Sequence, residues 1–190
     1  MKNVLMIVGS LRKNSFNRQL AKEIETILAD RADVTYLEYS DLPYMNQDIE
    51  SPVPDSVASV RAAVQEADGI WICTPEYNFN IPGVLKNLLD WLSRPMDPND
   101  RKSASAVRGK TVTISGVAGK SAAAGVRKSL KTLLEIISMN VVHGVGTGIF
   151  LDAGAFQTGI VSLSNESKAA LARQAEEFLI ALSHESVETK

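Results

Sequence analysis

Apolar runs alternate along the chain with stretches in which apolar residues recur at helical spacing. The first run, residues 4–8, is apolar throughout and ends at Gly9, a pattern typical of a strand buried on both faces of a parallel sheet. The helical spacing predicts helices at about 16–30, 56–66, 82–93, 125–138 and 166–183. The apolar runs predict strands at 4–8, 34–39, 69–74, 110–115 and 141–150, the last broken by glycines.

Five strands interleaved with helices, with no second core, predict a three-layer α/β fold built on an open sheet. A chain of 190 residues is long enough to bury one large core, so we expect a single domain over residues 1–190. Hydrophobic residues make up 45% and charged residues 22% of the sequence, which argues against wholesale disorder.

The charge balance limits the partners of the protein. Twenty basic and 22 acidic residues give a net charge of −2, and neither sign is gathered in one block. We therefore expect no nucleic-acid partner, and any anion site must be built locally from a few groups.

The cysteine content limits the chemistry further. Cys73 is the single cysteine, which excludes an internal disulfide and a cysteine-based zinc site, and its apolar surroundings predict an inert thiol. No apolar stretch approaches the roughly 18 residues of a membrane helix, and the N-terminus lacks a signal-peptide pattern. We expect a cytoplasmic protein without a membrane span.

The segment GSLRKNSFN follows the first predicted strand and leads into a predicted helix. Free backbone N–H groups and the positive end of the helix dipole favour an anion there. Ser10, Ser15 and Asn17 can donate to phosphate oxygens, and Arg12 can add charge-assisted hydrogen bonds. One glycine, without G-x-G-x-x-G spacing, favours a single terminal phosphate over a dinucleotide pyrophosphate. The alternative is that Asn14 or Ser15 only caps the helix.

The segment PEYNFNIPG, residues 75–83, follows the third predicted strand and is bounded by two prolines that restrict its backbone. A rigid loop with aromatic residues and free peptide groups can present donors and acceptors to the edge of a flat heterocycle. Because ligands gather at the carboxyl ends of strands in open parallel sheets, we expect this loop beside GSLRKNSFN. The alternative is an ordinary turn whose aromatic side chains pack on the core.

A third loop at this edge, residues 116–124, begins with GVAGKS, which ends like a P-loop. The P-loop pattern needs a glycine five residues before Gly119, but Ile114 stands there, inside a predicted strand. This argues against nucleoside triphosphate binding and leaves Lys120 solvated or at a cofactor rim. The sequence also lacks the G-x-S-x-G motif of acyl transfer and an acidic metal-loop pattern.

The helix predicted at 82–93 is unusually apolar. Its apolar residues cover an arc of roughly 160°, whereas a helix lying on a sheet typically needs about 100°. The excess predicts a second burial surface, such as that of a homodimer or homotetramer. A deeply buried helix in a monomer is the alternative.

Together, GSLRKNSFN, PEYNFNIPGVLKNLLDW and the glycine-bearing loop after the fourth strand resemble the NAD(P)H-dependent FMN reductases, the flavodoxin-like quinone, azo and chromate reductases. The resemblance extends to about Val145. It implies a flavodoxin-like, five-stranded sheet in the order 2-1-3-4-5, noncovalently bound FMN, and dimers or tetramers.

The resemblance also implies which residues contact FMN. The residues expected to hold the phosphate are Ser10, Arg12, Ser15, Phe16 and Asn17. Those expected to meet the ribityl chain and the isoalloxazine edge are Pro75, Glu76, Tyr77 and Asn78, and those expected to close the other side of the ring are Ser115 and Gly116.

The implied reaction is two-electron transfer from NADH or NADPH, by hydride transfer to flavin N5, followed by reduction of a small acceptor in ping-pong fashion. The acceptor is a quinone, an azo compound, free flavin or a metal oxyanion. The chemistry belongs to the cofactor, so we expect no catalytic side chain and no metal. Two alternatives stay open: a flavodoxin-type electron carrier without NAD(P)H oxidation, and a flavin sensor that binds a partner.

Three segments are less determined. Residues 42–48 are expected to wall the flavin pocket of their own or a partner subunit. The polar loop at 94–109 has no assigned role. The segment LDAGAFQTGIVSLSNES, residues 151–167, departs from the Asp-rich, glycine-bearing turn usual in the family, which leaves the substrate and partner surfaces there open.

Overall fold

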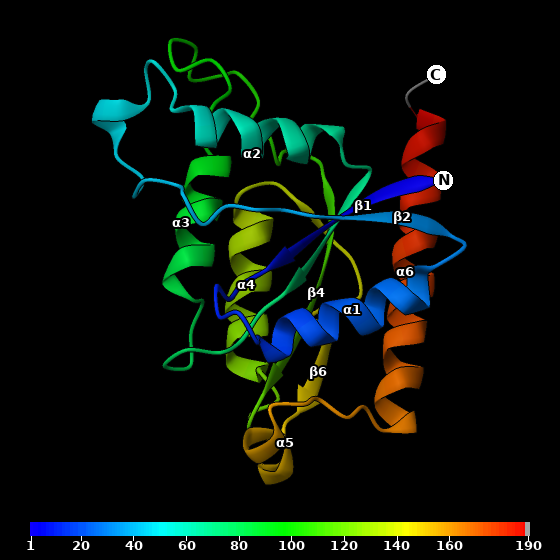
Figure 1. The fold of residues 1–190 in the computed structure, drawn as a ribbon. Coiled ribbons are helices and arrows are strands. Elements are labelled where there is room, and N and C mark those ends of the chain that lie inside the picture. The colour runs from blue at the N-terminus through cyan, green and yellow to red at the C-terminus, as the bar shows by residue number, and fades with distance from the viewer. Residues whose placement is uncertain (189–190) are drawn as a thin grey trace.

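A parallel sheet of six strands forms the centre of the molecule in the computed structural model, which describes residues 1–188 (Figure 1). The order is β2-β1-β3-β4-β5, and β6 also pairs with β4. The predicted flavodoxin-like α/β fold with strand order 2-1-3-4-5 is therefore confirmed, with one strand more than expected. The strands are β1 (Lys2–Val8), β2 (Ala32–Tyr36), β3 (Gly69–Cys73), β4 (Thr111–Ala118), β5 (Asn140–Val141) and β6 (Thr147–Phe150).

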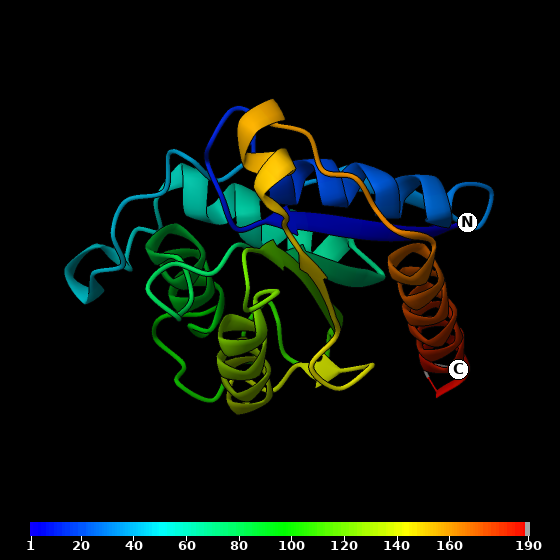
Figure 2. The same ribbon diagram turned by 90° about the horizontal axis from the view of Figure 1, so that it is seen from below.

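Helices cover both faces of the sheet, as Figures 1 and 2 show. One face carries α1 and α6, and the other carries α2, α3 and α4. Alternate residues of each central strand point to opposite faces and both sets are buried, which explains the continuous apolar runs. The helices are α1 (Phe16–Leu28), α2 (Asp55–Glu66), α3 (Gly83–Leu92), α4 (Ala124–Ile136), α5 (Ala153–Thr158), α6 (Asn165–Glu188) and the short 3-10 helix η1 (Gln47–Ile49).

The strand predicted at 141–150 is two strands, β5 and β6, which follow one another along the same edge of β4. The turn between them uses positive φ at His143, Gly144 and Gly146. At Gly146 a Cβ atom would stand 1.7 Å from the carbonyl oxygen of Ile114, so only glycine fits there. The glycines noted in the sequence therefore mark a complete break in the strand.

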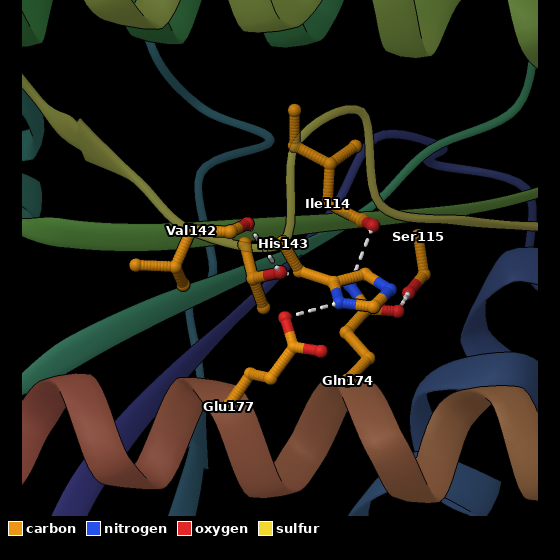
Figure 3. Close-up of polar contacts among 7 residues, drawn as sticks. Ile114, Ser115, Val142, His143, Gln174 and Glu177 are labelled. Atoms are coloured by element: carbon orange, nitrogen blue, oxygen red, sulfur yellow. Dashed lines mark hydrogen bonds and ion pairs between the residues drawn. The ribbon is translucent and has the colours of Figure 1, made fainter.

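Polar side chains of α6 meet the sheet at this break (Figure 3). The buried Gln174 donates from Nε2 to the carbonyl oxygen of Ile114 (2.7 Å) and accepts from Ser115 Oγ (3.0 Å). Beside it, Glu177 pairs with His143 Nδ1 at 2.7 Å. Because Ile114 lies between the pairings with β5 and β6, Gln174 satisfies a carbonyl that the interrupted edge leaves open.

The second predicted strand, 34–39, is shifted to Ala32–Tyr36 in β2. Leu37 still donates its N–H to the carbonyl oxygen of Met6 (3.0 Å), but the chain then leaves the sheet. Tyr39 instead donates its hydroxyl to the carbonyl oxygen of Val8 (2.6 Å), and its ring is buried on the face of the sheet that α2, α3 and α4 cover.

The wide apolar arc of α3 is covered within the chain. Leu85, Leu88 and Trp91 are fully buried, and Trp91 donates from Nε1 to the carbonyl oxygen of Pro43 (2.8 Å). Val107, at the end of the 94–109 loop, is buried in the same cluster. The structure thus agrees with the deeply buried helix, and the arc no longer supports a second burial surface. A homodimer or homotetramer stays a prediction.

Within residues 1–188, no helix is both long and apolar enough to cross a membrane.

Candidate functional site

β1 and β3 end side by side at one edge of the sheet, and the neighbouring β4 continues beyond them to Ala118. Val8 of β1 pairs with Cys73 of β3, and Cys73 pairs with Ser115 of β4. The loops that follow enclose a cavity of about 220 Å³, far more than the ~10–15 Å³ that one water molecule needs. Eight of the eleven predicted site residues line this cavity. They are Ser10, Arg12, Ser15, Phe16, Asn17, Pro75, Glu76 and Tyr77.

The start of α1 leaves hydrogen-bond donors free at the cavity. Ser15 caps the helix, because its Oγ accepts from the N–H groups of Asn17 (3.2 Å) and Arg18 (3.4 Å). Ser15 is therefore the capping residue, and its hydroxyl hydrogen stays available for donation to a ligand. The first turn carries no acidic side chain, and no described residue accepts a hydrogen bond from the N–H of Phe16. The guanidinium of Arg12 lies 5.0 Å from the centre of the Phe16 ring.

Asn17 joins this loop to the end of β4. Its Nδ2 donates to the carbonyl oxygen of Val117 (3.1 Å), and its Oδ1 accepts from the N–H of Val117 (3.0 Å). The side chain is 2% exposed. One amide hydrogen remains for a ligand, so the main effect of Asn17 is to hold two walls of the cavity together.

The second loop lies beside the first, as expected. Ser10 Oγ and Tyr77 Oη are 3.4 Å apart. Tyr77 and Asn80 exchange both backbone hydrogen bonds (3.2 and 3.0 Å) around Asn78 and Phe79, whose φ values are 51° and 60°. This is a two-residue turn. Phe79 is 81% exposed, so the aromatics of this turn do not all pack on the core, and Asn78 stands at its tip outside the cavity.

Glu76 turns from the second loop toward α4. Its Oε2 accepts from the N–H of Val126 at 2.7 Å. The helix begins after Ala122 and Ala123, both at positive φ, and has no side-chain cap of its own. At Gly125 a Cβ atom would stand 2.7 Å from Glu76 Oε2, so the carboxylate occupies the space that a larger residue would need. Glu76 therefore caps α4 and fixes the wall to which it belongs.

Ser115 and Gly116 do not line the cavity. Ser115 is fully buried, and its Oγ accepts from Trp71 Nε1 (3.1 Å) on the α6 side of the sheet. At Gly116 a Cβ atom would stand 2.7 Å from the carbonyl oxygen of Thr74. Both residues lie outside the cavity because they are inside β4, which continues to Ala118, beyond the strand end expected at residue 115. The wall comes instead from Val117, Ala118 and Gly119.

Besides Val117, Ala118 and Gly119, sequence reasoning missed two further lining residues, Leu151 and Phe156. Leu151 follows β6, and Phe156 lies on α5, next to the start of α1 in Figure 2. The residues that could have predicted α5 from the sequence are the two that cap it. Asp152 accepts from the N–H of Ala155 (2.7 Å), and Gly159 ends the helix at φ 73°.

The thiol of Cys73, next to the site, lies in an environment that disfavours the reactive thiolate. Cys73 is fully buried, and burial raises the pKa of its thiol well above the ordinary range. This agrees with the inert cysteine expected from the sequence. Among the described residues, no group of three or more His, Cys, Asp and Glu side chains could hold a metal ion.

Comparison with known proteins gives the site a family context. The family model described as NADPH-dependent FMN reductase matches residues 2–149. The 2-hydroxy-1,4-benzoquinone reductase of Burkholderia sp is 35% identical over 138 residues, which cover 72% of this chain and 74% of that protein. The quinone reductase of Escherichia coli K12 is 33% identical over 165 residues, covering 83% and 84%.

Solved structures agree. FerB of Paracoccus denitrificans, described as a flavoenzyme NAD(P)H:(acceptor) oxidoreductase, superposes with a TM-score of 0.83 at 27% identity, over 97% of this chain and 98% of that one. A flavodoxin from the domain Archaea has a TM-score of 0.59 at 12% identity, covering 97% and 100%, and shows the fold alone.

Proposed function

Because the chain belongs to the NADPH-dependent FMN reductase family, we propose that the cavity at the ends of β1, β3 and β4 binds FMN and that the acceptor of the enzyme is a quinone. The protein is an oxidoreductase, with FMN as cofactor and NAD(P)H as co-substrate. The observation that carries the proposal is the meeting of two separately predicted loops in one cavity.

The donor set at the start of α1 fits the phosphate of FMN. Ser10 and Ser15 offer hydroxyls, Phe16 offers a backbone N–H, and Arg12 offers a guanidinium. Helix N-termini favour phosphate, and a guanidinium makes strong charge-assisted hydrogen bonds with it. A neutral or cationic ligand would gain little from this arrangement, so the loop supports the phosphate end of a flavin mononucleotide.

The opposite wall fits the flat part of the ligand. Pro75 and Tyr77 provide a rigid, largely apolar surface, and Val117, Ala118 and Gly119 of the neighbouring β4 end line the same cavity. Bound FMN would supply the redox chemistry, taking up a hydride from a nicotinamide and passing two electrons on. The protein's part is to bind and orient the cofactor. No side chain of the cavity is needed as a general acid or base.

The same opening would serve both substrates. Tyr77 lines the cavity and is half exposed, and we propose that the nicotinamide and the quinone both approach the flavin past this side chain. Two substrates that use one opening in turn follow ping-pong kinetics. The names of the two curated relatives support a quinone as the acceptor.

The test is steady-state turnover of the FMN-loaded protein. NADH and NADPH are compared with menadione, 1,4-benzoquinone, an azo dye, chromate and free FMN as acceptors. We expect the highest kcat/KM with a quinone and parallel lines in double-reciprocal plots. Full FMN loading without oxidation of either nicotinamide would support an electron carrier instead. Faster turnover of another acceptor would refute the quinone assignment, and converging lines would refute the ping-pong order.

A further inference from the structure

An aromatic stack stands beside the anion loop. The rings of Phe16 and Phe156 meet edge to face, with centroids 5.8 Å apart and planes at 88°. The Arg12 guanidinium lies 5.0 Å from the Phe16 centroid. All three residues line the cavity, yet Phe156 is 62% exposed. The α5 helix thus presents a large apolar side chain to the site without a covering partner among the described residues.

The segment that carries Phe156 is firmly attached to the protein. Leu151 donates its N–H to the carbonyl oxygen of Ala118 (2.8 Å) and is buried. Beyond the helix, Gln19 of α1 donates to the carbonyl oxygen of Gly159 (2.8 Å) and accepts from the N–H of Val161 (2.9 Å). The position of α5 is therefore tied at both ends to elements that build the cavity.

This wall lies outside the part of the chain that defines the family, because the family model matches residues 2–149 and α5 begins at Ala153. Resting on the proposed FMN site, we infer that Phe156 is a specificity-determining residue: it closes the phosphate end of the cavity and selects the mononucleotide FMN over the dinucleotide FAD.

The physical reason lies in the chemistry at the phosphate. In FMN the phosphate ends the molecule, whereas in FAD it continues into a second phosphate and an adenosine. An extension from a phosphate held by Ser10, Arg12 and Ser15 would have to pass the side chains that line this end of the cavity, and Phe156 is one of them, packed edge to face against Phe16.

The test measures the dissociation constants of FMN, FAD and riboflavin by flavin fluorescence with apoprotein. Phe156→Ala is compared with Phe156→Leu, which retains more apolar volume, and with Phe156→Trp, which retains an aromatic ring. Phe150→Ala is the matched control, since Phe150 is similarly exposed (59%) but does not line this cavity.

In Phe156→Ala we expect the ratio of the FAD to the FMN dissociation constant to fall by about tenfold. Riboflavin affinity should be unchanged, and Phe156→Trp and Phe150→Ala should keep the ratio of the unchanged protein. In Phe156→Leu the ratio should lie between that of Phe156→Ala and that of the unchanged protein. An unchanged ratio in both Phe156→Ala and Phe156→Leu overturns the inference. Failure of the unchanged protein to bind FMN would overturn the proposed function itself, so the two failures are distinguishable.

Discussion

Asn17 and Val117 stand 100 residues apart in the sequence, and the side-chain amide of Asn17 makes two hydrogen bonds with the backbone of Val117. The amide takes the place of a neighbouring strand on the edge of β4 where β3 has ended. It joins the loop at the start of α1 to the end of β4, so one buried side chain couples two segments that both line the cavity.

Asn17→Ala should destabilise the protein strongly. The change leaves the N–H and the carbonyl oxygen of Val117 without partners in a buried place, and each unsatisfied group costs about 1–3 kcal/mol. We expect the free energy of unfolding, measured with urea on the apoprotein, to fall by about 2–4 kcal/mol. Asn14→Ala, an exposed change in the same loop, should be near neutral. Equal stability of both variants would contradict the coupling role of Asn17.

Arg12→Ala should weaken FMN selectively. A hydrogen bond to a charged group contributes about 1.5–3 kcal/mol, so the dissociation constant of FMN should rise by about tenfold to a hundredfold. Riboflavin lacks the phosphate, and its affinity should change little. Lys13→Ala is the control, because Lys13 adjoins Arg12 but does not line the cavity. A parallel loss of both flavins would place the phosphate elsewhere.

Glu76→Ala should destabilise the apoprotein, because Glu76 Oε2 accepts from the first turn of α4, which has no cap of its own. Helix caps contribute about 1 kcal/mol, and we expect a loss of about that size in urea unfolding. Glu76→Gln retains an acceptor but not the charge, so its loss should be smaller. Glu23→Ala, an exposed change on α1, should have almost no effect. A larger loss in Glu76→Gln than in Glu76→Ala would refute the capping role.

Asp68→Asn should change how stability depends on pH. Burial raises the pKa of Asp68, but the N–H of Asn3 (2.7 Å) and the ammonium of Lys2 (3.3 Å) outweigh it and hold the pKa below its ordinary value of 3.8. A depressed carboxyl pKa stabilises the folded state above the ordinary pKa, and this contribution is lost as the pH falls through the lower folded value.

The free energies of unfolding of the wild type and of Asp68→Asn should therefore differ most above about pH 5 and converge as the pH falls toward about 2. Urea unfolding at a series of pH values measures the gap. Asp33→Asn, an exposed change on the neighbouring β2, serves as the control. A gap that widens on acidification would show the opposite sign and contradict the assignment.

Sequence reasoning succeeded where a local pattern and a buried environment agree. The run that became β3 is apolar and buried throughout, and β1 is apolar and buried from Val4 to Val8, so composition and burial point to the same element. In β4 the buried residues alternate between polar and apolar side chains, and the existence of the strand was still predicted correctly. The two conspicuous loops were placed side by side correctly, because parallel strands present their carboxyl ends at one edge.

Prediction from the sequence failed where a contact between distant residues decides the local structure. The fourth strand was predicted to end at Ser115, but β4 pairs with β6 as far as Ala118, and the Ser115 side chain donates to Gln174 instead of lining the cavity. The pairing of two segments so far apart leaves no local signal. The α5 helix was missed for a similar reason: it is six residues long, contains Gly154, and is held in place by Gln19 of another helix.

The chain beyond residue 149 also completes the core, through the α6 helix. Leu171, Phe178 and Leu182 of α6 pack on the same face of the sheet as Trp71, and Gln174 closes the interrupted edge. A fragment trimmed to the family-matched region would expose the indole of Trp71 and one face of the sheet to water. Such a fragment would be an aggregation hazard rather than a minimal reductase, since the stretch that marks the family is shorter than the stretch that closes the core.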